Sequence, residues 1–209
     1  MKLVNYSRQL ILRFVCGETF FLVVESVKEL REIVDELLKS VQEENEDWIL
    51  SEDEEIQKKG SLMEIIFSPW MIDVNNRRIQ KGLLKQIIQC IQQGMEIDRV
   101  QHILSETRLL LDHINDELPL GFEYDVEDIS EILKECNIRF YEERDLVTRL
   151  NQYMKICSEI LGIRIFVFIG LKNYLTSEEI GVLAREAGYL GCCILCIESA
   201  SDGTEKKLT

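Results

Sequence analysis

Three short, continuously apolar segments constrain the fold of this chain more than any other feature of its sequence. They are TFFLVVE at residues 19–25, IRIFVFI at 163–169 and CCILCIE at 192–198. A shorter segment, Leu62 to Phe67, has the same character. Strands that are apolar at every position are buried on both faces, which is typical of a parallel sheet covered by helices. The sequence therefore predicts an α/β fold with a mostly parallel sheet.

Helical patterns follow two of these segments. Between the last two, Thr176 and Glu179 have the spacing of a capping box and precede an apolar helical stripe. A strand, a helix and a second strand in this order form a βαβ unit, whose strands are parallel. A second amphipathic helix is expected at residues 27–41. The first fourteen residues are expected to form two short strands as an edge hairpin.

The middle of the chain, from residue 75 to 161, has the apolar period of long helices. Its first part predicts one helix of about forty residues, or ~60 Å, which is longer than such a sheet can cover. We therefore expect this helix to project. A second helix, at 142–161, is expected to run back beside it, with a shorter one at 126–136 between them. The predicted organisation is an α/β head of residues 1–74 and 163–209 with an inserted helical leg of residues 75–162.

The chain is acidic overall, with 24 Lys and Arg against 38 Asp and Glu and a formal net charge of −14. This balance argues against a protein that is basic all over, as a histone-like protein would be. The first ten residues lack the apolar core of a signal peptide, and no apolar run approaches the ~18–20 residues of a membrane helix. We expect a soluble, cytoplasmic protein with no membrane partner.

The seven cysteines are odd in number and scattered among apolar neighbours, which is not the pattern of a disulfide-framed secreted domain. We expect them to be free thiols. Cys193 and Cys196 form a C-x-x-C pair, but positions three apart on a strand point to opposite faces. These two sulfurs are therefore not expected to share a metal ion.

The charges are unevenly distributed. Residues 42–55 hold eight acids and no base, which favours a solvated loop. Residues 74–95 hold no acid and four bases, namely Arg77, Arg78, Lys81 and Lys85. These four fall on roughly one side of the predicted helix. They are either a stripe that faces phosphate groups or simply the charged positions of a helix whose other residues are apolar or amide.

The usual parts of an enzyme site are missing from the sequence. No G-x-x-x-x-G-K-[ST], G-x-G-x-x-G, G-x-S-x-G or H-E-x-x-H motif occurs. The only two histidines, His102 and His113, lie ~16 Å apart along one predicted helix, which is too far to bind one metal ion together. We therefore expect no enzymatic activity.

One stretch, residues 115–131, is rich in carboxylates around a turn at Pro119 and Gly121. Its acids are Asp116, Glu117, Glu123, Asp125, Glu127, Asp128 and Glu131. Clustered carboxylates and carbonyls suit a hard cation such as Ca²⁺. The spacing is not that of an EF-hand, and the same acids suit a helix start, where Glu127 and Asp128 would be favoured by the helix dipole. The residues alone leave both interpretations open.

Four segments together resemble a known family. They are TFFLVVESVKELREIV (19–34), IDVNN (72–76), ELPLGFEYDVEDISEIL (117–133) and IRIFVFIGLKNYLTSEEIGVL (163–183). With them the chain resembles, over roughly residues 10–198, the ring-forming accessory protein of type II-A CRISPR operons that is needed for acquiring new spacers. The resemblance implies a degenerate relative of P-loop ATPases without a working nucleotide site, plus a helical leg.

The resemblance also implies a function and its residues. It implies a non-catalytic homotetrameric ring that is stabilised by Ca²⁺, binds double-stranded DNA ends and works with other CRISPR acquisition proteins. Glu123, Asp125 and Glu131 are the implied ligands, with Glu117 or backbone carbonyls completing the shell. Arg77, Arg78, Lys81 and Lys85, with Lys172 in the loop after the second long strand, are the candidate DNA contacts. No element suited to reading bases is evident, so binding is expected to be independent of sequence.

Two alternatives are retained. In one, the carboxylates from Asp116 to Glu131 form a two-metal DNA nuclease site. No Lys or His partner lies within that cluster, which disfavours it. In the other, the protein is an acidic helical adaptor that binds only proteins.

Overall fold

The structure is a computed structural model that describes residues 1–43, 47–53, 55–94 and 96–200. By their contacts the residues divide into two compact units. One contains Met1–Val74 and Glu142–Thr209, and the other contains Asn75–Tyr141. We call them the sheet unit and the helical unit.

A parallel sheet forms the centre of the sheet unit. Its strands are β3 (Thr19–Val24), β8 (Cys193–Ser199), β7 (Ile165–Ile169) and β6 (Met63–Ile66), in that order. Each neighbouring pair is parallel, and the register places Thr19 opposite Ile194 and Ile165 opposite Cys193. β3, β6 and β7 lie within the apolar segments that predicted them, and β8 extends one residue beyond its segment, to Ser199. The α/β class with a parallel sheet is confirmed.

The sheet unit contains a second sheet, of which the sequence predicted only the N-terminal hairpin. It contains β1 (Lys2–Asn5), β2 (Leu10–Arg13), β4 (Ile49–Glu52) and β5 (Glu55–Gln57), in the order β2-β1-β4-β5, and it is antiparallel. The N-terminal hairpin β1–β2 confirms the prediction for the first fourteen residues. The prediction of a solvated loop at residues 42–55 is wrong for β4 and for Glu55, where β5 begins, and Trp48 and Leu50 in this stretch are almost completely buried. Residues 44–46 and 54 of this acidic run lie outside the described residues.

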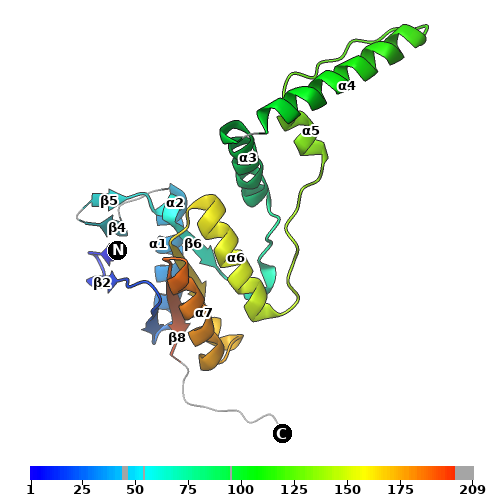
Figure 1. The fold of residues 1–209 in the computed structure, drawn as a ribbon. Helices are drawn as coiled ribbons and strands as arrows, with labels where there is room; N and C mark the ends of the chain where they lie inside the picture. The colour runs from blue at the N-terminus through cyan, green and yellow to red at the C-terminus, as the bar shows by residue number, and fades with distance from the viewer. Residues whose placement is uncertain (44–46, 54, 95, 201–209) are drawn as a thin grey trace. The chain divides into compact units, whose positions relative to one another are not determined.

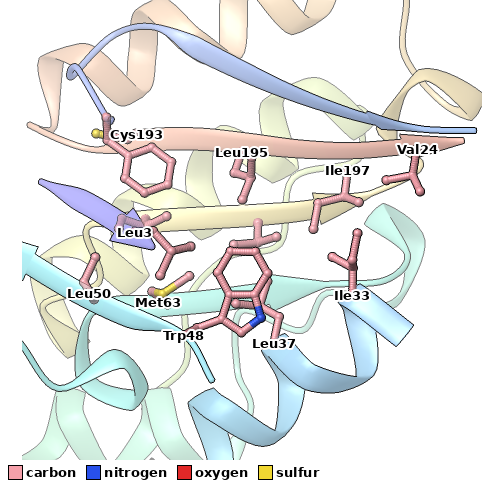
Figure 2. Close-up of a cluster of buried hydrophobic side chains, with 13 residues drawn as sticks. Leu3, Val24, Ile33, Leu37, Trp48, Leu50, Met63, Cys193, Leu195 and Ile197 are labelled. Atoms are coloured by element: carbon pink, nitrogen blue, oxygen red, sulfur yellow. The ribbon is translucent and has the colours of Figure 1, made fainter. Parts of the chain in front are cut away.

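The main core lies between the two sheets and α1 (Val27–Glu43). Figure 2 shows Trp48 and Leu37 facing the residues of β8 that point to this side, including Leu195 and Ile197. Cys193 belongs to the same cluster, whereas Cys196 is buried outside it. The two cysteines therefore lie on opposite faces of β8, as predicted.

The opposite face of the parallel sheet buries the alternate side chains, such as Phe166 and Ile194. The helices α6 (Leu146–Leu161) and α7 (Ser177–Tyr189) cover this face (Figure 1). The hydroxyl of Tyr153 on α6 donates to the Glu64 carboxylate on β6 at 2.9 Å. α7 begins with the predicted capping box of Thr176 and Glu179. Short helical segments of this unit are α2 (Lys59–Leu62), η1 (Pro69–Met71) and η2 (Leu171–Asn173).

The contact-based division differs from the expected domain boundary at one place. Residues 142–162, which we expected in the helical leg, belong to the sheet unit. The reason is that α6 packs on α7 and η1 and completely buries Leu150, Met154 and Cys157. The apolar stripe that suggested a long helix-helix pair is thus the stripe of a helix that covers a sheet.

The helical unit contains α3 (Arg77–Gln93), α4 (Ile97–Glu117) and α5 (Ile129–Glu135). The prediction of one helix of about forty residues is wrong, because α3 ends at Gln93 and Gly94 has an extended backbone. Glycine favours the interruption because it loses more conformational freedom in a helix than any other residue. None of the helices in the described residues combines the length and apolar character that crossing a membrane requires.

Candidate nucleic-acid interface

The start of α3 is fixed by two asparagines. The Asn76 side chain accepts hydrogen bonds from the backbone N–H groups of Arg78 at 3.0 Å and Ile79 at 3.1 Å, which is a typical N-cap. The Asn75 amide accepts from the Phe140 N–H at 2.8 Å and donates to the Phe140 carbonyl at 3.0 Å. The first turn of α3 is therefore tied to the segment with which the chain leaves the helical unit.

The four predicted DNA contacts of this unit lie on α3. Arg77, Arg78, Lys81 and Lys85 are all exposed. At about 100° per residue they fall within an arc of about 100°. Ile79 is completely buried away from this arc, and Leu83 and Ile87 are partly buried. Among the described residues no ion pair involves Arg77, Lys81 or Lys85. Their charge is available to a ligand.

A groove of about 270 Å³ lies between α3 and α5. Its apolar lining is Leu83, Leu84, Ile87, Leu133 and Ile138, and its polar lining is Arg77, Gln80, Lys81, Lys134 and Asn137. No acidic side chain is among these described lining residues. Three cationic side chains from two helices thus border one groove in a protein whose formal net charge is −14.

Lys134 is the residue that the sequence interpretation missed. It lies on α5 between the exposed Glu131 and Glu135, in a stretch that reads as acidic. Only the packing of α5 against α3 brings it to the same groove as Arg77 and Lys81. The sequence pattern of α5 does not predict this position of Lys134, because the position depends on how α5 packs against α3.

The carboxylate-rich stretch runs back along α4. The Asn115 side chain on α4 accepts from the Phe122 N–H at 2.7 Å, and the Arg108 guanidinium donates to the Val126 carbonyl at 2.7 Å. Between them, the Tyr124 hydroxyl donates to the Asp112 carboxylate. Phe122, Tyr124 and Val126 are partly buried, and the residues between them are exposed. The segment is therefore extended, with Glu123 and Asp125 pointing away from α4.

The four predicted calcium ligands are spread along this arrangement. Glu117 is the last residue of α4, with a carboxylate oxygen 3.5 Å from a His113 ring nitrogen. Glu131 lies in the first turn of α5, two residues after Ile129. Ile129 and Leu104 of α4 line the same pocket, so the start of α5 lies near Leu104. Between Leu104 and Glu117 the helix rises about 20 Å. Within the described part of one chain, no group of three or more His, Cys, Asp or Glu side chains is arranged to hold a metal ion.

Asp128 has a clear structural role. Its carboxylate accepts from the Ser130 N–H at 3.1 Å and caps α5. The hydrogen bond from this N–H holds the pKa of Asp128 below its usual value. The helix-start interpretation therefore describes Asp128 well.

The fifth candidate DNA contact, Lys172, lies in the sheet unit, in the segment between β7 and α7. Its ammonium nitrogen is 4.3 Å from the centroid of the Phe21 ring, and its backbone N–H donates to the Glu198 carboxylate at 3.1 Å. Glu198 is itself buried, with 5% of its surface exposed. Lys172 thus caps the carboxyl end of the parallel sheet.

Comparison with the families of known proteins gives a match over more than half of the chain. A family model described as CRISPR-associated protein (Cas_Csn2) matches residues 40–208. No curated protein matches the sequence.

Proposed function

Because this chain belongs to the Csn2 family of CRISPR-associated proteins, we propose that it binds the ends of double-stranded DNA during the acquisition of new spacers. Membership of this family fits a role in CRISPR adaptation. In the proposed form the protein is a non-catalytic homotetrameric ring, which binds DNA without regard to sequence and acts with other CRISPR acquisition proteins.

The observation that carries the proposal is the groove between α3 and α5. Arg77, Lys81 and Lys134 border it without an acidic neighbour among its described lining residues. Phosphate groups are the usual targets of such exposed bases in DNA-binding proteins, and each contact releases counterions from the duplex. The long side chains of Lys and Arg can follow the backbone of any sequence, and phosphate contacts carry no base information.

The net charge of −14 disfavours binding to DNA, and the proposed ring would reduce this repulsion. A duplex carries about one phosphate charge per 1.7 Å of its axis, so an acidic subunit with randomly placed charges would repel it. Cyclic symmetry repeats the same patch in each subunit. One groove per subunit would therefore present bases on several sides of the duplex, while the acidic surfaces face elsewhere.

Calcium binding remains a prediction, and no step of the proposed DNA binding depends on it. Since one chain does not gather Glu117, Glu123, Asp125 and Glu131, an ion in this region would need backbone carbonyls or oxygens from another copy of the chain. Such a site would link assembly of the ring to the metal.

The test of end binding compares one plasmid in two forms. The protein is mixed with the covalently closed circle and with the same DNA cut once, and binding is measured by mobility shift. We expect clear binding to the linear form and much weaker binding to the circle. Equal affinity would contradict end binding, and cutting of either form in the presence of Mg²⁺ would favour the nuclease alternative.

The residues are tested by charge reversal. A variant with Arg77, Lys81 and Lys134 changed to Glu should lose binding to the linear DNA. The matched control changes Lys28, Lys155 and Arg185, which are also exposed, to Glu and alters the net charge equally. If both variants lose binding to the same degree, the groove is not the contact surface.

A further inference from the structure

Two cysteines that are distant in sequence have their sulfur atoms 3.9 Å apart. They are Cys16, in the turn before β3, and Cys193, the first residue of β8. The parallel pairing of β3 with β8 brings them together. The Gly17 N–H donates to the Cys192 carbonyl at 3.3 Å, and the Cys16 thiol lies 3.4 Å from the Gly191 carbonyl oxygen. The turn before β3 is therefore fixed beside the start of β8.

Two glycines permit this close approach. A Cβ atom on Gly188, near the end of α7, would lie only 2.7 Å from the Cα atom of Gly17. Gly17 itself has a φ of +82°, which residues with side chains rarely adopt. The turn that carries Cys16 can therefore lie directly against α7 and β8.

The two thiols have different environments. Cys16 is exposed, whereas Cys193 is 1% exposed and lies at one end of the core cluster in Figure 2. Burial, followed by the nearby Cys16, raises the pKa of the Cys193 thiol to about 12. A dissolved oxidant can thus reach Cys16 directly, while Cys193 is protonated at neutral pH and shielded from solvent.

We propose that Cys16 and Cys193 form an oxidisable thiol pair, which hydrogen peroxide converts into a disulfide. The Cys16 sulfur attacks one oxygen of the peroxide, the O–O bond breaks, and a sulfenic acid and one water are formed. The Cys193 sulfur then attacks the Cys16 sulfur, the S–O bond breaks, and the hydroxyl group leaves with the Cys193 proton as a second water. Two thiols lose two electrons in total, and the peroxide gains them.

The geometry favours this pair over other products. The sulfurs must approach from 3.9 Å to about 2.05 Å. Cys16 can make this movement because it lies in a turn and not in the sheet. The neighbouring Cys192 points elsewhere, since its sulfur contacts the Ser158 hydroxyl and the Ile163 carbonyl oxygen. Cys193 is therefore the expected partner.

The disulfide would join residues that are 177 positions apart and would fasten β3, an edge strand, to β8. A crosslink that closes so long a loop restricts the unfolded chain strongly. We expect oxidation to raise the thermal midpoint of the sheet unit, and a dithiol reductant to reverse the change.

The experiment uses the full-length protein treated with a graded excess of hydrogen peroxide. Free thiols are then alkylated under denaturing, non-reducing conditions, and the peptides are identified by mass spectrometry. We expect one intramolecular crosslinked pair, which contains Cys16 and Cys193 and separates on reduction. A Cys16–Cys192 crosslink, or oxidation of Cys90 and Cys136 while Cys16 and Cys193 stay reduced, would overturn the proposal.

Variants separate the roles of the two thiols. Cys16→Ser changes an exposed residue and should abolish the crosslink while leaving Cys193 reduced. In Cys193→Ala, Cys16 should accumulate as a sulfenic acid that a dimedone probe traps. If this buried substitution prevents folding, the Cys16→Ser result still decides. The matched control, with both Cys90 and Cys136 changed to Ser, should form the crosslink as the unmodified protein does; loss of the crosslink there would contradict the assignment.

Discussion

The Asn75 side chain forms two hydrogen bonds with the backbone of Phe140, one as acceptor at 2.8 Å and one as donor at 3.0 Å. Asn75 and Phe140 lie near the two ends of the helical unit, 65 positions apart. Gln80 on α3 also donates to the Asn75 oxygen, at 2.9 Å. One amide thus joins the entry of the chain into this unit, its exit and the first turns of α3.

Replacement of Asn75 by Ala should destabilise the helical unit by about 1–3 kcal/mol, because partly buried polar groups are left without their hydrogen bonds. Amide hydrogen exchange should show the Phe140 N–H exchanging faster than in the unmodified protein. Asn75→Asp keeps the oxygen acceptor and removes the donor, so it should preserve most of the Phe140 protection. Exchange at Phe140 that is unchanged in Asn75→Ala would contradict this role.

Arg8 joins the N-terminal hairpin to α1 by an ion pair of 2.7 Å with the Glu36 carboxylate. This hydrogen bond lowers the pKa of Glu36 below its ordinary value of 4.5. The stabilisation is therefore present above pH 4.5 and is lost as the pH falls through the folded-state pKa. Arg8→Gln should lower the free energy of unfolding by about 1–2 kcal/mol near neutral pH.

The measurement for Arg8 is urea denaturation at a series of pH values. The difference between Arg8→Gln and the unmodified protein should shrink on acidification. The control is Lys39→Gln, whose ion pair with Asp35 is exposed on both sides and should leave the acid dependence unchanged. A difference that stays constant down to the acid transition would show that Glu36 is not responsible.

A substitution at Lys134 tests whether the groove between α3 and α5 binds phosphate. Lys134→Gln should weaken binding to linear DNA and reduce the steepness of its salt dependence. Removing one Lys–phosphate interaction should lower the slope of log K against log salt by about 0.9. Binding is measured by fluorescence anisotropy at several salt concentrations, with the exposed Lys155→Gln as control. The same slope in both variants would exclude Lys134 as a phosphate ligand.

The contribution of the α7 capping box to the stability of the sheet unit can be measured by substitution. The Thr176 hydroxyl oxygen accepts from the Glu179 N–H at 3.3 Å, and the Glu179 carboxylate accepts from the Thr176 N–H at 2.8 Å. Thr176→Ala should cost about 1 kcal/mol of unfolding free energy, while Thr176→Ser should cost less because it keeps the acceptor. Urea denaturation measures both. Equal losses in the two variants would indicate that the methyl group, and not the cap, is important.

Removal of metal tests the predicted assembly. Light scattering after size exclusion should give a tetramer in Ca²⁺ and smaller species after chelation. Changing Glu123 and Asp125 to Gln and Asn should produce the smaller species even in Ca²⁺, whereas Asp98→Asn on α4, also exposed, should not. A tetramer that persists in chelator would show that calcium is not needed for the assembly.

The sequence was sufficient for the elements whose pattern is local. The strands β3, β7 and β8 follow from continuous apolar runs, and the start of α7 follows from the spacing of Thr176 and Glu179. The strand β4 was missed because its apolar residues lie within a run of acids, so that the charge of the run concealed the buried Trp48 and Leu50.

The candidate site was predictable only where it lies on one helix. The stripe on α3 follows from spacing alone, whereas Lys134 joins it through packing between helices. The placement of α6 depends on the same kind of information, because an amphipathic stripe specifies that a face is buried but not which surface covers it. The carboxylates were grouped by their closeness in sequence, but the extended segment along α4 spreads them out.

The order of strands in the parallel sheet has a consequence for biosynthesis. Its two middle strands, β7 and β8, are translated after both edge strands. β6 therefore has no partner in this sheet until β7 has been translated up to Ile169, and β3 has none until β8 has been translated up to Ser199. The helical unit is contiguous in the chain and can fold during this interval. In nascent chains that stall before β7, the helical unit would therefore be folded while β3 and β6 of the sheet unit have no partner strands. Unpaired strand edges are targets for chaperones and proteases.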